Sequence, residues 1–188
     1  DATDKGYETT VNIMALSTVH EKDLLEALEV LAETPVGTVY IVDSFGSLYS
    51  EEIRDLTRQF RRAMNGTDKL IGIHSHNNQQ LAYANTIEAI VCGASMLDAT
   101  INGIGRGAGN CPLELLIGFL HNPKFKIRPI LECIQNTFLP MRDKMEWGYQ
   151  LAYMVTGQLN QHPRYAIKAR EGENPDDIVA FFDQMTND

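Results

Sequence analysis

The sequence predicts an α/β fold in which parallel strands alternate with helices, and two observations lead to this prediction. Apolar runs rich in strand-forming residues alternate with amphipathic segments at a spacing of about thirty residues, which is typical of βα units in a parallel sheet. Polar residues follow the end of each apolar run, where the carboxyl ends of parallel strands collect ligands. The alternation stops after Leu120, so a helical region is expected to follow.

Four βα units can be assigned along the first part of the chain. The expected strands span 7–16, 36–43, 70–76 and 96–100. The helices that follow them are expected at 20–34, 50–64, 79–92 and beyond Pro112. Within these helices apolar residues recur every three or four positions, which is the spacing of one helix face.

Capping residues mark the expected helix ends. Ser50 is expected to cap the second helix, and Gly93 to close the third. Either Asn110 or Cys111 is expected to cap the fourth, which has Pro112 in its first turn.

The rest of the chain is expected to be helical over 127–138, 145–159 and 174–185. The last of these helices has Asn174 as a candidate N-cap and Pro175 in its first turn. We therefore divide the chain into an α/β part, residues 1–121, and a helical part, residues 122–188.

The composition is that of a globular protein and excludes several other classes. The chain has 188 residues, of which 44% are hydrophobic and 22% charged, enough to bury a core. Its net charge of −9 argues against a nucleic-acid partner, and no segment is apolar enough to span a membrane. Its cysteines form no close pair, which favours a reducing compartment, the cytoplasm. Because the chain begins without methionine, we expect it to be part of something longer.

Two histidines, His74 and His76, follow the apolar run 69–73. A strand places residues i and i+2 on the same face, so both imidazoles would point the same way. Two convergent imidazoles suit a metal ion, whereas a structural role for the pair is the alternative.

A glycine-rich loop, residues 103–109, leads from the fourth expected strand to Asn110. Its glycines permit positive φ angles and a close approach of backbone to a ligand, although a flexible turn would also use them. A helix that begins just beyond the loop favours a carboxylate or phosphate at its N-terminus. The lysine-hydroxyl pair of a P-loop is absent.

The order and spacing of these residues resemble a known family, the TIM-barrel metallolyases. This family includes 3-hydroxy-3-methylglutaryl-CoA lyase, 2-isopropylmalate synthase and 4-hydroxy-2-oxovalerate aldolase. The resemblance rests on residues 74–78, Leu81, 84–86, Gly93, 98–99, 102–105 and 108–114. Gly105-Arg106-Gly107 departs from the longer glycine loop of the lyase branch, which favours the aldolase branch.

The resemblance implies that the four units are strands five to eight of a (β/α)8 barrel, which needs roughly 250 residues when complete. His74 and His76 would ligate a divalent metal, Mn²⁺ or Mg²⁺, with Asn110 as a further ligand or near neighbour. The missing N-terminal half-barrel would carry an Asp-Arg-Glu segment that supplies another ligand and an enolate-stabilising arginine. We therefore expect this chain alone to be inactive, and its open sheet edges to favour self-association.

Further polar residues at the expected strand ends are candidates for substrate binding. These residues are Asn12, Asp43 and Asn102, and Gly105 of the glycine-rich loop is a further candidate. Asp43 could instead cap a neighbouring helix.

The segment 148–153 resembles a Gly-Tyr-x-x-x-Tyr segment in the helical tail of the 4-hydroxy-2-oxovalerate aldolases. In those enzymes a tyrosine of this segment takes part in substrate binding or proton transfer, and the resemblance implies that role for Tyr149. Because Tyr149 and Tyr153 are four residues apart on one helix face, packing alone is the alternative.

The predicted function is that of a metal-dependent aldolase or lyase that cleaves or forms a C–C bond next to a 2-oxo acid such as pyruvate. One alternative is a Claisen-type acyltransferase of the isopropylmalate or homocitrate synthase branch. Another is a non-catalytic binding module that kept the family's shape. A homo-oligomer and an aldehyde dehydrogenase partner are further expectations from the resemblance.

Overall fold

The computed structural model describes residues 2–187 and has a parallel four-stranded sheet in the order β1-β2-β3-β4. The strands are β1 (Thr10–Ile13), β2 (Thr38–Asp43), β3 (Leu70–Ser75) and β4 (Met96–Leu97). Ile13, Ile41, Ile73 and Leu97 are neighbours across the sheet. The predicted α/β fold with four parallel strands is therefore confirmed, although the fourth strand is shorter than expected.

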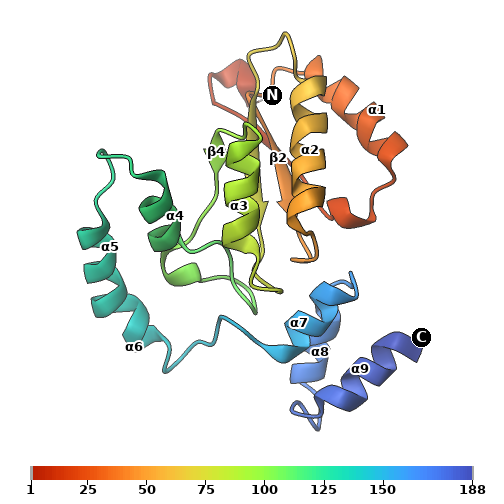
Figure 1. Cartoon of the computed structure of the whole chain (residues 1–188), viewed down its shortest axis with the longest axis vertical. Coiled ribbons are helices and arrows are strands. Elements are labelled where there is room, and N and C mark those ends of the chain that lie inside the picture. The colour runs from red at the N-terminus through yellow and green to blue at the C-terminus, as the bar shows by residue number, and fades with distance from the viewer. Residues whose placement is uncertain (1, 188) are drawn as a thin grey trace. The chain divides into compact units, whose positions relative to one another are not determined.

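Helices follow each strand and continue to the end of the described chain (Figure 1). Those of the α/β part are α1 (Glu21–Ala32), α2 (Ser50–Ala63), α3 (Ala82–Val91) and α4 (Leu113–Leu120), with short 3-10 turns at Thr3–Lys5, Leu16–Thr18 and Ile101–Gly103. Those of the tail are α5 (Ile127–Cys133), a π-helical stretch (Ile134–Phe138), α6 (Leu139–Met141), α7 (Leu151–Gln158), α8 (Arg164–Arg170) and α9 (Ile178–Asn187). None of the helices in residues 2–187 has the length and apolar character needed to cross a membrane.

Contacts divide the chain into two compact units. The first unit, called the sheet unit, holds the chain up to Ser44 together with Leu48–Ser75 and Ala84–Asp98. The second, called the loop-and-tail unit, holds Phe45–Ser47, His76–Tyr83 and the chain from Ala99 onward. The predicted division at residue 121 falls inside the second unit and stays a prediction.

The core of the sheet unit lies between the sheet and its helices. Ile41 and Ile73 are fully buried, and they share this core with Leu28 of α1 and with Ile53 and Phe60 of α2. Figure 1 shows α1, α2 and α3 running alongside the strands. Because successive residues of a strand point to opposite faces, burial of the odd-numbered residues of β2 and β3 against helices sends the even-numbered ones to the other face.

That other face carries Asn12 and His74, two of the predicted site residues. Asn12, Tyr40 and Gly72 are neighbours across β1, β2 and β3, and Val42 is the neighbour of His74. The strand pattern therefore places His74 on the face opposite the helices, as the metal-site prediction requires.

The loop-and-tail unit has its own small core. Ala152, Tyr153 and Val155 of α7 pack with Ala166 of α8 and Phe181 of α9. Ala108 of the glycine-rich loop belongs to the same cluster. The tail is therefore anchored to this loop by apolar contact.

Three predicted helix caps are wrong. Tyr49, not Ser50, is the N-cap of α2, and its backbone N–H donates to Glu52 Oε2 at 2.9 Å. Pro112 is the N-cap of α4, in place of Asn110 or Cys111.

The third error concerns the last helix. It starts at Ile178 rather than beside Asn174, and Asp177 Oδ1 accepts a hydrogen bond from Ala180 N. Asp177 competes successfully because its carboxylate reaches a first-turn N–H that Asn174 is too far upstream to bond.

Candidate active site

His74 is held in the sheet unit by a carboxylate. Its Nδ1 lies 3.0 Å from Oδ2 of Asp98, which follows β4, and the Asp98 backbone N–H donates to Ile73 O at 3.0 Å. Because a carboxylate oxygen accepts hydrogen bonds, this contact favours the tautomer with the proton on Nδ1 and the lone pair on Nε2. This tautomer is the one that a metal ligand with a supporting carboxylate adopts.

His76 lies in the loop-and-tail unit beside Asn110. The two residues form an isolated antiparallel bridge, and the next backbone N–H, that of Asn77, donates to Gly109 O at 2.8 Å. Two of the three predicted metal ligands are thereby brought next to each other from segments 34 positions apart in the sequence.

The side chain of Asn110 has a fixed orientation. Its Nδ2 donates to Ile104 O at 3.1 Å, while Oδ1 is buried and has no hydrogen-bond partner. A Cβ on Gly105 would lie 2.6 Å from that Nδ2, so only glycine leaves room for the amide here. Gly105 is therefore in contact with Asn110, and its role in substrate binding stays a prediction.

Asn102 is held at the start of the glycine-rich loop by two neighbours. Its backbone N–H donates to Glu114 Oε2 at 3.0 Å, and its carbonyl accepts from Trp147 Nε1 at 2.9 Å. Its φ angle of 56° is in the left-handed region, which asparagine tolerates better than most residues. Its side-chain Nδ2 is buried without a partner, so the site has a donor available.

Tyr149 lines a cavity of about 520 Å³ in the loop-and-tail unit. Asn77, Asn102, Gly103 and Arg142 line the same cavity. Tyr149 is 57% exposed. Two predicted site residues, Tyr149 and Asn102, therefore line the same cavity. Asn77, which follows His76 in the sequence, lines it too.

Tyr153 has a different environment. It is 3% exposed, and a Cβ on Gly107 would overlap its ring. Its carbonyl accepts from the buried Asn78 Nδ2 at 3.3 Å, and Asn78 in turn lies against Gly46 and Gly157. Burial explains Tyr153 as a packing residue, whereas it does not explain Tyr149.

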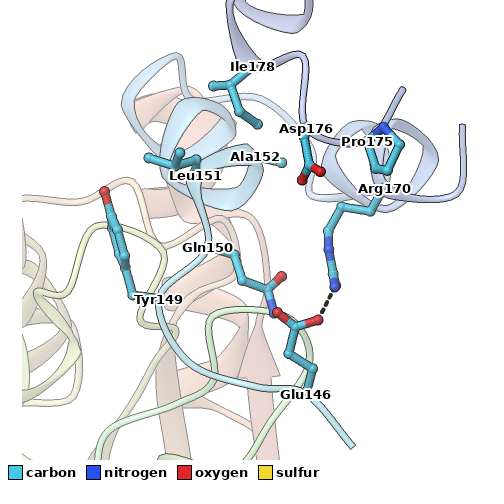
Figure 2. A pocket seen from close by; sticks show the side chains of 9 residues that line it. All are labelled: Glu146, Tyr149, Gln150, Leu151, Ala152, Arg170, Pro175, Asp176 and Ile178. Carbon is cyan, nitrogen blue, oxygen red and sulfur yellow. Dashed lines mark hydrogen bonds and ion pairs between the residues drawn. The ribbon is translucent and has the colours of Figure 1, made fainter. Parts of the chain in front are cut away.

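Tyr149 also lines a second cavity, of about 600 Å³ (Figure 2). Glu146 and Arg170 form an ion pair in its wall, and both amide atoms of Gln150 are buried there without partners. Figure 2 shows the Tyr149 ring directed away from the ion pair. The Tyr149 hydroxyl therefore does not serve this pair.

The two remaining predicted residues belong to the sheet unit. Asn12 is exposed in β1, on the face that also carries His74. Asp43, the last residue of β2, is only 1% exposed. A carboxylate so deeply buried needs compensating polar contacts.

An ion pair on the helical side of the sheet unit joins α2 to α3. Arg54 Nε of α2 lies 2.6 Å from Glu88 Oε1 of α3. The hydrogen bond from Arg54 holds the pKa of the Glu88 carboxyl below its usual range, and burial partly opposes this. Burial raises the pKa of the neighbouring Cys92 thiol, as does its hydrogen bond to Glu88, so this thiol stays protonated.

Histidine, cysteine and acidic side chains do not gather in groups of three or more within residues 2–187. Among the described residues, His76 and the Asn110 amide oxygen are candidate metal donors in the loop-and-tail unit, and His74 is a candidate donor in the sheet unit. These residues suit a metal ion, because Oδ1 of Asn110 is a buried acceptor without a partner and the contact with Asp98 favours a lone pair on His74 Nε2. Sequence reasoning missed the Asp98 contact, although the position of Asp98 after the fourth strand was a signal.

The fold and these residues define a class of protein. The HMGL-like family model matches residues 1–136, and the chain belongs to this family. The predicted family and the predicted TIM-barrel type of α/β fold are confirmed.

Three similar proteins are described as a decarboxylase or as aldolases. An oxaloacetate decarboxylase of Mycobacterium tuberculosis is 40% identical over 120 residues, 63% of this chain and 34% of the relative. The 4-hydroxy-2-oxovalerate aldolase 2 of Mycolicibacterium smegmatis is 36% identical over 184 residues, 90% of this chain and 52% of the relative. The solved N-terminal domain of a proposed aldolase from Bacteroides vulgatus is 31% identical with a TM-score of 0.78, covering 95% of this chain and 60% of that one. The chain thus spans between about a third and a half of the length of these two curated relatives.

Proposed function

We propose that the protein to which this chain belongs is a divalent-metal-dependent aldolase that cleaves or forms the C–C bond next to a 2-oxo acid. The similarity to 4-hydroxy-2-oxovalerate aldolases extends over 90% of the chain, helical tail included, which favours this branch. Manganese or magnesium is the proposed ion, because imidazole, amide and carboxylate ligands together do not select a soft metal.

The observation that carries the proposal is the state of Asn110. Its amide is fixed by Ile104 and Gly105, and it directs a buried oxygen with no partner, next to His76. A buried acceptor left unsatisfied costs about 1–3 kcal/mol, so such atoms point to a ligand. A metal ion bound to His74, His76 and Asn110 would offset that cost.

Each residue has a stated task in the proposed reaction. A bound divalent ion would act as the Lewis acid that polarises the 2-oxo group and stabilises enolate charge. Asn102 Nδ2 would donate to a substrate oxygen, with Asn12, Asp43 and Gly105 as further substrate contacts. The Tyr149 hydroxyl would transfer the proton of the substrate hydroxyl group.

A second candidate reaction is decarboxylation of oxaloacetate, and the 40% identity to an oxaloacetate decarboxylase favours it. Both reactions break a C–C bond next to a 2-oxo group and leave the enolate of pyruvate, so the same ligand set would serve either. The Claisen-type acyltransferase and the non-catalytic module are the remaining alternatives. Only the aldol reaction needs a base for a substrate hydroxyl, which is the task proposed for Tyr149.

The test is a comparison of three reactions catalysed by the full-length protein. Pyruvate release from 4-hydroxy-2-oxo acids, pyruvate and CO₂ release from oxaloacetate, and thiol release from acetyl-CoA with a 2-oxo acid are measured with Mn²⁺, with Mg²⁺ and after chelation. We expect aldol cleavage that chelation abolishes and Mn²⁺ restores. Metal-independent turnover, or none in all three assays, would contradict the proposal.

Metal content tests the ligands separately from activity. His74→Ala and His76→Ala should each lower bound Mn²⁺ in elemental analysis, whereas His20→Ala, at an exposed position, should not. Full metal content in both histidine variants would refute the assignment.

The rest of the assembly is also proposed. We expect an N-terminal half-barrel to supply a metal-ligand aspartate and an arginine, and the complete protein to be a cytoplasmic homo-oligomer with an aldehyde dehydrogenase as partner. Cys92 and Cys111 are both buried and are not in a disulfide, which agrees with a reducing compartment.

A further inference from the structure

The ring of Tyr40 lies across β3 at Gly72. The two residues are neighbours in the sheet, and a Cβ on Gly72 would lie 2.5 Å from two ring carbons of Tyr40. No real Cβ approaches another atom so closely, so the ring can occupy this place only because residue 72 is glycine. Tyr40 is 7% exposed, and its position is therefore set by packing.

The Tyr40 hydroxyl reaches the carboxylate that holds His74. It is hydrogen-bonded to Asp98, whose Oδ2 also lies 3.0 Å from His74 Nδ1. Burial, followed by the Asp98 charge and this hydrogen bond, raises the pKa of Tyr40, so the phenol stays protonated and donates. All three side chains belong to the sheet unit.

We propose that Tyr40 and Asp98 are positioning residues that hold the His74 imidazole in its Nδ1–H tautomer and so present Nε2 as a metal ligand. The phenol donates to Asp98, and Asp98 accepts from His74 Nδ1. The proposal rests on the proposed function in one respect, namely that His74 binds a metal ion.

The chain of contacts differs from an incidental surface pair. The His74 and Asp98 side chains are 26% and 41% exposed, and an exposed pair would by itself contribute little. A carboxylate with one partner could turn toward water. Here the Tyr40 hydroxyl and the backbone bond from Asp98 to Ile73 restrict that motion, so the carboxylate stays directed at Nδ1.

Each contact also has a chemical consequence for metal binding. A carboxylate on the distal nitrogen raises the basicity of the coordinating nitrogen, and loss of such a partner weakens metal affinity by about 10- to 100-fold. The phenol acts one contact further away, and its loss should weaken affinity less than the loss of Asp98 does.

The first experiment reads the tautomer directly in the metal-free full-length protein. Long-range ¹H–¹⁵N spectra distinguish a protonated from an unprotonated ring nitrogen, and we expect His74 to be protonated on Nδ1. Asp98→Asn should shift the population toward Nε2–H, since the new side chain no longer carries the charge that favours a proton on Nδ1. A wild-type His74 that is already Nε2–H would overturn the proposal.

The second experiment measures Mn²⁺ affinity by calorimetry in the same protein. We expect Asp98→Asn to weaken binding by about 10- to 100-fold and Tyr40→Phe by a smaller factor. Tyr7→Phe and Asp68→Asn are the matched controls, because both residues are exposed, and they should bind like the wild type. Gly72→Ala should resemble Tyr40→Phe, because the added methyl displaces the ring.

The two experiments separate the two hypotheses. If the wild type binds Mn²⁺ and both Asp98→Asn and Tyr40→Phe bind it equally well, the positioning role is overturned while the proposed function stands. If the wild type binds no Mn²⁺ at all, the proposed function fails and the proposal fails with it.

Discussion

Replacing Gly107 by alanine should destabilise the loop-and-tail unit through two separable effects. Gly107 has φ = 55°, in the left-handed region, and an added Cβ would overlap the Tyr153 ring. Tyr153 is 3% exposed and cannot move without disturbing the core shared by α7, α8 and α9.

The magnitude follows from adding the two effects. The left-handed backbone costs an alanine about 1–2 kcal/mol. Overpacking a buried ring adds roughly 1–3 kcal/mol, so the free energy of unfolding should fall by roughly 2–5 kcal/mol in total. For a chain of this size that corresponds to a decrease in Tm of about 4–20 °C.

Two other glycines provide controls for the separate effects. Gly66 has φ = 84° with no atom within 4 Å of an added Cβ, so Gly66→Ala should show the backbone effect alone. Gly118, inside α4, also has nothing within 4 Å and no positive φ, and Gly118→Ala should stabilise the helix by about 0.5–1 kcal/mol.

The assay is urea unfolding followed by fluorescence of Trp147, the single tryptophan of the chain, which lies in the same unit as Gly107. Combining Gly107→Ala with Tyr153→Ala should destabilise less than the sum of the two single changes, because the smaller side chain removes the overlap. If Gly107→Ala behaves like Gly66→Ala, the ring does not lie on Gly107 and the reasoning is wrong.

The other predictions concern the site, the chain and the pH dependence. Tyr149→Phe should lower the rate of aldol cleavage about 10²-fold or more in the full-length protein without lowering its Tm. Tyr153→Phe should leave the rate nearly unchanged. Steady-state kinetics measure both rates, and the reverse pattern would exchange the roles of the two tyrosines. The purified 188-residue chain should cleave no 2-oxo acid at around 1 s⁻¹ or above, and turnover at that rate would contradict the need for an N-terminal half. Since the pKa of Glu88 is lowered in the folded state by Arg54, the pair stabilises the fold above the unfolded pKa of about 4.3 and loses this effect as pH falls through the folded value. Glu88→Gln should therefore reduce stability at pH 7 and match the wild type in acid, and an equal deficit at both pH values would exclude the charge as the cause.

Periodicity predicted much of the fold and of the candidate site. The alternation of apolar runs located all four strands, and it placed His74 at the carboxyl end of the third; that His74 and His76 bind a metal ion stays a prediction. These features depend on local sequence alone, since the alternation of side chains along a strand is a property of the backbone.

The features that the sequence did not predict are contacts that depend on strand register and helix N-caps for which neighbouring residues compete. Tyr40 meets Asp98 only because of how β2, β3 and the residue after β4 are aligned, and one residue of slip would turn Tyr40 to the other face. Gly72 within a strand was a signal for a close approach, yet it does not name the partner.

The tail was the least predictable part. The helix expected over 145–159 begins only at Leu151, because Gly148 has φ = 114° and Gln150 is extended. The short helix α8 was not predicted, since a seven-residue segment has too few turns to show a period.

The hydrogen bond of Asn78 affects which segments of the protein unfold together. This residue is 2% exposed, follows His76 by two positions, and bonds the α7 carbonyl of Tyr153. Because the bond joins the loop after β3 to the tail, local unfolding of α7 should release both segments together as one cooperative unit in hydrogen exchange. A protease acting on the tail, far along the chain, would then set His76 and its neighbours free, so the lifetime of the loop is governed by the stability of α7.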